Sequence, residues 1–440
     1  GIAVGGPMKN KKLKYRLVLR TDYADGFRKN IFLNKSDTSK KDELTLRYKL
    51  NWDFNETTDI NFIISKVDMD DPADIWTVDG SLNTLSDRPG MDSQETNSYG
   101  IKITKNFINF DLQSFTSSTK TDVIFSYDAD WGNPDSHFPY IYDYFSETLR
   151  KRDTFSQEIR ILSKNIDFSQ KKPFEWVFGM DFSELEETNV TRDDGIYGDP
   201  SDPYGPYASE SVISRNYKAE NFSLFGNIDY FLTKNYKLAI GLRWENWDSK
   251  YNDSNQESFN PSDNMNGGKI SLIKNNESSN IYLSIAKGYK QGGFNIGLDA
   301  TDSSIKDSLI YDPEFLINYE IGVNSNGNDT NLNYSAVIFF SKREDQQVLI
   351  SKQIDPTDPN TFSYLTQNAA EGENYGLEIS SNYFASDNLN LFANFGFLKT
   401  KIKNWESRID LEDRDQAHAP EKTYSVGMKY DLKNNFYLKF

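Results

Sequence analysis

The sequence predicts an all-β fold, and more specifically a transmembrane antiparallel up-and-down β-barrel. Three observations lead to this prediction. Apolar and polar residues alternate over long runs, the connections between these runs are alternately short and long, and no stretch approaches the roughly eighteen consecutive apolar residues of a membrane-spanning helix. About eighteen strand segments can be counted along the 440 residues, and the set is incomplete at both ends.

Composition excludes several classes of function. The formal net charge of -17 argues against a nucleic-acid partner, which requires a basic face. The absence of cysteine removes disulfides, thiolate catalysis and cysteine-based zinc sites, and only His137 and His418 are available for imidazole chemistry. Disordered chains are poor in aromatic residues, whereas this chain is 14% aromatic, so we expect it to fold. No catalytic triad, phosphate loop or metal-ligand set is present, and we expect neither enzyme activity nor a cofactor.

The alternation is longer than in soluble sheets. Two runs, "ELTLRYKLNWDF" and "NYKLAIGLRWENWD", place apolar residues on one face for ten to twelve positions, close to the roughly nine to eleven that cross a bilayer. In "IYLSIAKGYKQGGFNIG" the same alternation ends in a Gly-rich segment. Aromatic pairs near the ends of the runs, Trp52 with Phe54 and Trp244 with Trp247, are expected at the membrane interfaces. The predicted outward residues of the first two runs are Leu44, Leu46, Tyr48, Leu50, Trp52, Phe54, Tyr236, Leu238, Ile240, Leu242 and Trp244.

The connections alternate in length, as they do in outer-membrane barrels with short periplasmic turns and long extracellular loops. Short turns are predicted near 6–10, 55–57, 105–108, 165–172, 232–235, 275–279, 325–330, 384–388 and 432–435. Long loops are predicted near 23–42, 70–95, 119–152, 189–216, 251–265, 289–314, 343–370 and 405–420. This parity places Phe440 inside a rising strand and Gly1 inside another, so we expect the chain to be an internal piece of a longer barrel protein.

Five stretches resemble TonB-dependent outer-membrane receptors, in the order that this family has them. "IAKGYKQGGFN" is similar to a strand-to-loop motif of the family. The other four are "GGPMKNKKLKYR", "DPEFLINYEIGVNS", "NAAEGENYGLEISSNYF" and "HAPEKTYSVGMKY". The residues that match the strand-to-loop motif are Gly288, Tyr289, Lys290, Gly292, Gly293, Phe294 and Asn295.

The resemblance implies a 22-stranded barrel of which residues 1–440 form one partial domain, without the N-terminal plug and the last strands. It implies capture of a scarce nutrient, such as a ferric siderophore, at extracellular loops and import driven by TonB, which would act through an N-terminal region absent from this sequence. It also implies a monomer in contact with outer-membrane lipid or lipopolysaccharide in a Gram-negative bacterium. Without plug and TonB box, this sequence by itself is not expected to perform energised uptake.

Ligand contacts are expected in the aromatic and Gly-rich loops, and the candidates are His137, Tyr140, Tyr204, Tyr207, Tyr289 and Lys290. A haem ligand is disfavoured because the segments that accompany such histidines in the family are missing. The acidic stretch 68–79 invites a calcium site, but its spacing does not fit an EF-hand loop, and a solvated acidic loop is the simpler interpretation.

Several inward charges could attract an anionic ligand, although the lumen of any barrel is polar. They include Lys14, Arg16, Arg20, Arg47, Lys49, Arg160 and Arg243. Two alternative functions stay open at this point, a passive porin-like channel and a structural or adhesive surface β protein. The identity of the ligand does not follow from the loop sequences.

Overall fold

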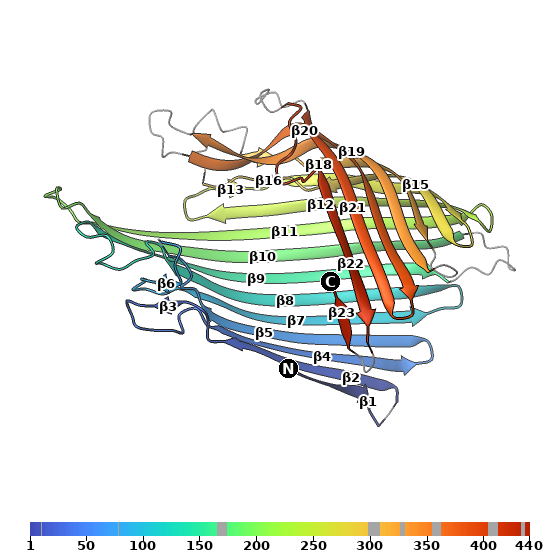
Figure 1. Cartoon of the computed structure of the whole chain (residues 1–440), viewed down its shortest axis with the longest axis horizontal. Helices are drawn as coiled ribbons and strands as arrows, with labels where there is room; N and C mark the ends of the chain where they lie inside the picture. Colours follow the sequence, from blue (N-terminus) through green and yellow to red (C-terminus); the bar gives the residue numbers. More distant parts are fainter. Residues whose placement is uncertain are drawn as a thin grey trace. The chain divides into compact units, whose positions relative to one another are not determined.

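A computed structural model describes residues 1–9, 11–77, 79–164, 174–297, 309–325, 331–353, 362–403, 412–432 and 436–440. This part of the chain consists of strands and their connections (Figure 1). Among these residues no helix has both the length and the apolar character needed to cross a membrane. The all-β prediction is therefore confirmed.

Nineteen strands are assigned to one sheet within the described residues. One of them, β13, has two residues, so the expectation of about eighteen substantial strands is confirmed. The strands of this sheet are β1 (Ile2–Pro7), β2 (Leu13–Ala24), β4 (Lys41–Asn55), β5 (Thr58–Pro72), β7 (Met91–Asn106), β8 (Phe110–Asp128), β9 (Ile141–Ser163), β10 (Phe174–Gly198), β11 (Tyr207–Phe231), β12 (Tyr236–Asp253), β13 (Ser258–Phe259), β14 (Ser262–Asn275), β15 (Ser279–Lys290), β18 (Glu314–Ser325), β19 (Leu332–Gln353), β20 (Phe362–Ser386), β21 (Leu389–Lys403), β22 (Lys422–Asp431) and β23 (Tyr437–Lys439). Two further pairs are β3 (Lys29–Asn30) with β6 (Asn83–Thr84), and β16 (Gly293–Phe294) with β17 (Ile310–Tyr311).

The chain divides into two compact units. Unit 1 comprises Gly1–Ile161, Met180–Phe222 and Asp248–Asn260, and unit 2 comprises Leu162–Gly179, Ser223–Trp247 and Pro261–Phe440. In unit 1, strands β1, β2, β4, β5, β7 and β8 pair antiparallel in chain order. In unit 2, the same up-and-down order runs from β14 and β15 through β18 to β23 (Figure 1). The prediction that 1–440 form a single domain stays a prediction.

The apolar face of the strands points outward instead of into a core. Leu283 is 54% exposed and pairs with Ile321, which is 52% exposed. Only seven hydrophobic residues among those described are buried. A soluble sheet would cover such a face, whereas hydrocarbon can solvate it, so the exposed alternation is what a lipid-facing barrel wall requires.

The outward face changes from apolar to charged toward the long-loop end of unit 1. On β10, Phe182 is followed two positions later by Glu184, and on β11 Phe222 is preceded by Glu220. The ammonium of Lys218 lies 2.8 Å from Glu184, and 3.0 Å from both Glu186 and Glu220. Paired charges of this kind are stable in water or headgroups but costly in hydrocarbon, so they mark the edge of the apolar band.

Of the two aromatic pairs predicted near the strand ends, the structure contradicts one member. The rings of Trp52 and Phe54 are in edge contact with centroids 4.9 Å apart, and Trp244 is exposed as expected. Trp247, however, is 1% exposed, so its assignment to the interface is wrong. Residues three positions apart lie on opposite faces of a strand, which sends Trp247 to the face opposite Trp244.

Most predicted turns are confirmed, but several predicted long loops are wrong in extent. Residues 56–57, 107–109, 232–235, 276–278 and 387–388 form short connections, while 165–173, 326–330 and 433–435 lie outside the described residues. The expected loop 119–152 shrinks to 129–140 because β8 and β9 extend to 19 and 23 residues. The expected loop 189–216 shrinks to 199–206 because β10 and β11 each extend to 25 residues. The expected strand length of ten to twelve residues is therefore too short. Backbone pairing between strands continues in water, where neither face of a strand needs apolar side chains. Segments without apolar alternation can therefore be strands, although their sequence resembles that of a loop.

Arginine substitutions on the two faces of β14 should have unequal effects. Leu272 is 43% exposed on the lipid face, whereas Ile273 points to the opposite side. We expect Leu272→Arg to lower the free energy of unfolding in lipid vesicles, and so to destabilise the protein, by about 2 kcal/mol, because the guanidinium is placed in hydrocarbon. Ile273→Arg should cost much less. Urea titration in vesicles measures both, and equal losses would contradict the assignment of faces.

Candidate ligand-binding face of unit 1

A buried polar cluster joins the long connections of unit 1. The Asn30 side chain donates to Asp74 Oδ2 at 3.0 Å and to the Ser86 carbonyl at 2.7 Å, and its Oδ1 accepts from the Leu33 amide. Thr84 Oγ1 also donates to Asp74, at 2.6 Å. Asn30 and Thr84 are fully buried. These bonds tie the β2–β4 connection to the β5–β7 connection, because the polar groups can be satisfied only when both are in place.

The same cluster reaches the β8–β9 connection through a carboxyl pair. Ser86 Oγ donates to Asp128 Oδ2 at 2.6 Å, and Asn133 Nδ2 donates to the Leu85 carbonyl at 2.8 Å. Asp128 and Asp130 are both buried. Burial first, and then the hydrogen bond between the two carboxyls, raises the pKa of Asp128 to about 8. The pair therefore holds one proton at neutral pH, which removes the repulsion between two buried carboxylates.

Aromatic rings line one face of the β9 and β10 strand ends. The Tyr142 ring lies 4.9 Å from Tyr144, 6.4 Å from Tyr197 and 5.1 Å from the His137 imidazole, between ring centroids. Tyr144 packs flat on Gly195, where an added Cβ would meet its ring at 2.1 Å. This face is the inward one, since the exposed apolar residues of β9 and β10, such as Phe155 and Phe178, have the opposite parity.

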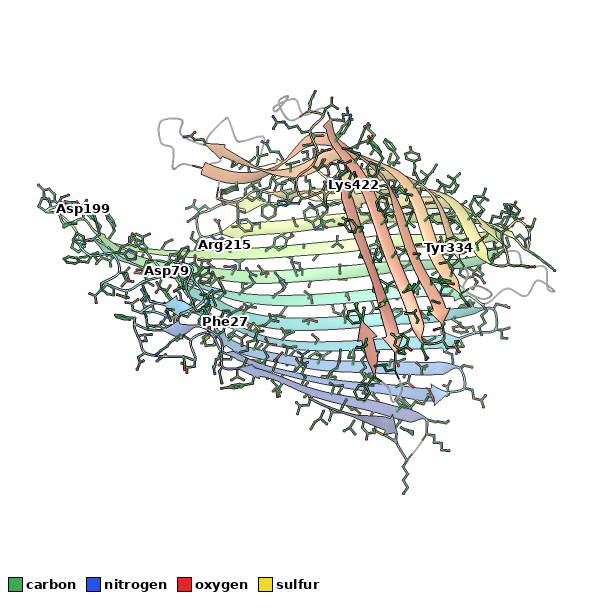
Figure 2. The ribbon with its side chains drawn as sticks, viewed as in Figure 1. Phe27, Asp79, Asp199, Arg215, Tyr334 and Lys422 are labelled. Carbon is green, nitrogen blue, oxygen red and sulfur yellow. The ribbon has the colours of Figure 1, made fainter. Side chains whose placement is uncertain are left out.

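Hydroxyls and then charges follow the aromatic rings along this inward face. Ser146 Oγ donates to Asp193 at 2.6 Å, and Thr191 receives a hydrogen bond from Arg215 at 2.9 Å. Farther down, Arg152 Nε donates to Glu187 at 2.7 Å, and Arg150 lies 3.4 Å from the same carboxylate. Figure 2 shows Arg215 on β11. We call this surface, formed by Tyr142, Tyr144, Ser146, Arg150, Arg152, Thr191, Tyr197 and Arg215, the inward ladder face.

A polar pocket lies on the outward side of β9 and β10, opposite the inward ladder face. The Arg88 guanidinium binds both oxygens of Asp194, at 2.6 and 3.0 Å, and stacks 4.4 Å above the Phe145 ring. The hydrogen bond to Asp194 raises the pKa of Arg88, which stays charged. The pocket of about 370 Å³ also includes Glu210. Arg88 also lies 3.5 Å from Asp143, so its ion pairs fix the β5–β7 connection to both β9 and β10.

Comparison with known proteins identifies the family. The family model described as TonB dependent receptor-like, beta-barrel matches residues 26–439. The chain belongs to this family. Members lie in the outer membrane of Gram-negative bacteria, so the short turns of this receptor barrel are periplasmic and its long connections extracellular. Figure 2 shows Phe27, Asp79 and Asp199 in three of these extracellular connections.

Individual relatives are distant. A "Probable TonB-dependent siderophore receptor PiuA" from Acinetobacter baumannii is 29% identical over 202 residues, which are 44% of this chain and 25% of that protein. The ferric yersiniabactin uptake receptor FyuA from Yersinia pestis superposes with a TM-score of 0.71 at 16% identity, over 99% of this chain and 64% of its own. BauA, the ferric preacinetobactin receptor from Acinetobacter baumannii, gives a TM-score of 0.66 at 12% identity, over 98% of this chain and 64% of its own. The chain thus spans less than two thirds of the length of these relatives.

The receptor fold brings four of the six predicted site residues into two pairs in unit 1. The Tyr140 amide donates to the His137 carbonyl at 2.9 Å, and the His137 imidazole lies beside the Tyr142 ring of the inward ladder face. Tyr207 Oη donates to Asp202 at 2.9 Å, and the Tyr204 amide donates to the same side chain at 2.9 Å. The Tyr204 ring is 84% exposed at the β10–β11 tip.

The other two predicted site residues, Tyr289 and Lys290, end strand β15 in unit 2. Tyr289 Oη lies 3.0 Å from Glu245 and accepts a hydrogen bond from Arg243 at 3.2 Å. Arg243 in turn donates to Glu245 at 2.7 Å. Lys290 is exposed, and its backbone pairs with Glu314. Tyr289 is thus held by charged partners, whereas Lys290 is directed to solvent.

The remaining motif residues shape the start of the extracellular connection. An added Cβ on Gly293 would lie 2.4 Å from the Tyr311 hydroxyl, and one on Gly292 would lie 2.5 Å from the Tyr311 carbonyl. The glycine pair is therefore required by a close approach of β17. Gly288 has open space around it, and Phe294 lies in β16. Asn295 exchanges two hydrogen bonds of 2.8 Å with the Thr366 backbone, which anchors the connection to β20.

The acidic stretch 68–79 does not converge on one point. Asp68, Asp70 and Asp71 belong to β5, Asp74 is buried in the polar cluster, and Asp79 caps the Ser81 amide at 2.9 Å. Within the described ranges no group of three or more His, Cys, Asp or Glu side chains could hold a metal ion. The interpretation as a solvated loop is therefore wrong for most of the stretch, because Asp68, Asp70 and Asp71 lie in a strand and Asp74 is buried, and it fits only Asp79.

Sequence reasoning missed the residues that form most of the inward ladder face. The segment "YIYDYF" was assigned to a loop, although Tyr140, Tyr142 and Tyr144 alternate in it. That alternation was the available signal. It was overlooked because the intervening Ile141 and Asp143 do not form a uniform second face.

Loss of Asn30 should open the extracellular connections locally. Asn30→Ala removes the donors to Asp74 and Ser86 and leaves a buried carboxylate short of a partner, at a cost of about 1–3 kcal/mol. We expect faster hydrogen exchange in 25–40 and 73–90, measured by mass spectrometry. Asn83→Ala, at an exposed position of β6, is the matched control. Unchanged exchange in Asn30→Ala would contradict a role of the cluster in holding the loops.

The Asp128–Asp130 pair should make these connections less stable as the pH rises. Because the folded state raises the pKa of Asp128 from its ordinary value of 3.8 to about 8, folding favours the protonated form, and loop stability should fall as pH rises from about 4 to about 8. Asp128→Asn keeps a donor to Asp130 without ionising. Because each pKa unit of the shift corresponds to a factor of about ten, it should slow limited proteolysis of 129–140 at pH 8.5 by at least tenfold.

The exposed Asp135 in the same connection supplies the control. Asp135→Asn should leave the ratio of cleavage rates at pH 8.5 and pH 5 as in the parent protein. If Asp128→Asn also leaves that ratio unchanged, the shared-proton account is wrong.

Proposed function

We propose that the protein captures a ferric siderophore, or a similar metal chelate, on the inward ladder face and imports it with energy from TonB. The single observation that carries the proposal is the sequence of rings, hydroxyls and arginines along one face of β9, β10 and β11. Family membership supports a role in nutrient reception rather than catalysis. The names of PiuA, FyuA and BauA, which refer to siderophore or ferric-complex reception, support iron chelates as the ligand class.

The chemistry of this face suits such a ligand. Ferric chelates present flat, often aromatic groups and negatively charged oxygens around the metal. The rings of Tyr142, Tyr144 and Tyr197 offer stacking surface at little conformational cost. Arg150 and Arg152 share a single carboxylate, Glu187, so this group of three side chains keeps a positive charge available for an anionic ligand.

The remaining predicted contacts extend this proposal. His137 borders the rings and Tyr140 follows it in the same connection, while Tyr204 and Tyr207 at the neighbouring hairpin tip would meet the ligand first. Tyr289 and Lys290 stay proposed ligand contacts within unit 2, apart from the inward ladder face. A monomer that engages the TonB complex through a region outside this sequence completes the proposed transport cycle.

Direct binding measurements test the ligand class. We expect the full-length protein, purified from outer membranes, to bind one of three ferric chelates, a tris-catecholate, a tris-hydroxamate or ferric citrate, with quenching of tryptophan fluorescence. Tyr144→Ala and Arg152→Ala should each weaken that binding by about tenfold or more, through lost stacking and lost charge pairing. Arg192→Ala is the matched control, since Arg192 lies on the outward face beside Glu147.

The outcomes separate the alternatives. Equal losses in Arg152→Ala and Arg192→Ala would place the ligand elsewhere. Uptake of ⁵⁵Fe-labelled chelate that persists in cells lacking TonB would contradict energised import and favour the passive channel. Absence of binding to all three chelates, with normal barrel folding, would overturn the ligand class.

A further inference from the structure

A cavity of about 650 Å³ lies on the inward side of unit 1 and extends across β2, β4, β5, β7, β8 and β9 (Figure 1). On β9 its walls include Glu158 and Arg160, which have the same parity as Arg152 of the inward ladder face. Its volume falls within the roughly 300–1,000 Å³ of small-molecule sites. Because Lys102 in its wall lies a few residues before the short connection 107–109, we call it the periplasmic pocket. The charged residues of its lining are Lys14, Arg16, Lys49, Lys102, Arg160 and Glu158.

Positive charge is in excess in this pocket, since its lining holds five cations and a single carboxylate. Two of the cations are neutralised by carboxylates. Lys14 lies 3.4 Å from Asp53 at the border of the pocket, and Arg160 forms an ion pair with Glu158. The other three cations keep their charge available to a guest.

Two of these three cations are placed directly opposite each other. Arg16 on β2 and Lys49 on β4 are cross-strand partners, and like charges in that position destabilise a sheet. Neither has a carboxylate partner within the part of the chain that the structure describes. Lys429 and Lys439 also face each other, across β22 and β23, but there Asp431 lies 2.7 Å from Lys429. An anion in the periplasmic pocket would supply the counter-charge that Arg16 and Lys49 lack.

An aromatic ring and an apolar patch complete the lining. The Lys102 ammonium lies 5.0 Å, and the Arg160 guanidinium 4.7 Å, from the centroid of the Phe115 ring. Lys102, the third available cation, has no carboxylate partner in the described ranges either. Gly100 stands beside Ile63, whose Cγ2 would lie 2.7 Å from an added Cβ, so the middle of the pocket stays open only without that side chain. Cations, a ring and open space suit an anionic ligand with flat groups.

The periplasmic pocket is too far from the inward ladder face for one small ligand to contact both. Arg152 and Arg160 lie on the same face of β9, eight residues and therefore about 27 Å apart. The group of Arg150, Arg152 and Glu187 keeps one positive charge, whereas the periplasmic pocket keeps three after its two ion pairs. Positive charge thus increases toward the periplasm, which draws an anion in that direction.

We propose that the periplasmic pocket is a second binding site for the imported chelate, which occupies it after leaving the inward ladder face. The proposal rests on the proposed transport function and adds that passage, unlike capture, depends on Arg16, Lys49 and Lys102. These groups would donate to the negatively charged oxygens of the chelate, while the Phe115 ring contacts its flat groups. A neutral chelate would gain little from them, so the pocket favours anionic chelates.

Comparison of binding with uptake tests the second site, in cells that produce the full-length protein. The probes are an anionic tris-catecholate chelate and ferric citrate, both labelled with ⁵⁵Fe. Equilibrium binding is measured in cells lacking TonB, and the uptake rate at saturating chelate in cells that have it. We expect Arg16→Gln/Lys49→Gln to bind with an affinity within about twofold of the parent protein, and to import about tenfold more slowly, because the attraction of a cationic cleft is lost.

Matched variants control for general effects on the inward face. Arg20 lies on the same face of β2 outside the pocket and is paired with Asp22 at 3.0 Å, so Arg20→Gln should import at the parent rate. Arg16→Lys, which keeps the charge, should also import at that rate. Heat-modifiable migration on gels shows that each variant is folded. If the double variant does not fold, Lys102→Gln takes its place, with the same expected split between binding and uptake.

Several results would overturn the second site. Uptake by the folded double variant at the parent rate would place the path elsewhere. A loss of binding affinity as large as the loss of uptake would assign these cations to capture. Ion leakage through the double variant in planar bilayers, absent from the parent protein, would mean that the cations hold the expected N-terminal plug instead.

Failure of the second site can be told apart from failure of the proposed function. A parent protein that binds and imports an anionic chelate, together with an equally active double variant, refutes the second site alone. If the parent protein binds neither anionic chelate, the second site is also refuted, and binding of the neutral ferric tris-hydroxamate then decides the proposed function.

Discussion

The ladder of backbone hydrogen bonds between neighbouring strands is the interaction on which the rest of this structure depends. In hydrocarbon no water is available to an unpaired peptide group, so each N–H and C=O of a spanning strand must meet a partner on the next strand. Antiparallel pairing in chain order meets this demand with short turns. The side chains are then free to alternate, and the outward ones, such as Leu283 and Ile321, can be apolar without any core to receive them.

Beyond the membrane edge the strands stay hydrogen-bonded to each other, but their outward side chains no longer contact hydrocarbon and need not be apolar. The outward face exchanges apolar residues for paired charges around Lys218. The connections cannot rely on a hydrophobic core either, and in unit 1 they are held by buried polar groups. Asn30 and Asp74 join two connections, and Ser86 with Asp128 joins the next. Such a cluster is stabilising only when all its members are satisfied, which favours one arrangement of the loops.

The architecture could be predicted from the sequence because its strongest constraint acts at every second residue. Alternation around Leu46 or Ile240, together with turn parity, was sufficient to place most strands. The limits of β9, β10 and β11 could not be obtained in this way, since strands in water need no apolar face. Trp247 cannot share the outward face with Trp244, because residues an odd number of positions apart lie on opposite faces of a strand.

The candidate site was only partly predictable for a related reason. Ring-rich segments were visible, and the His137 imidazole does lie beside the Tyr142 ring of the inward ladder face. The pairing of Tyr142 with Tyr197, and of Arg152 with Glu187, depends on the register between two long strands. Register is set by cross-strand contacts far apart in sequence, which a single chain read residue by residue does not disclose.

The position of the tyrosines on strands, rather than on flexible connections, has an evolutionary consequence. Each inward position of β9 and β10 can change its side chain while the backbone, its hydrogen bonds and the outward neighbours stay as they are. A new ligand preference can then arise through single substitutions, with no insertion or remodelling of a connection. The rigid backbone that limits movement during binding thereby widens the range of ligands open to descendants of this receptor.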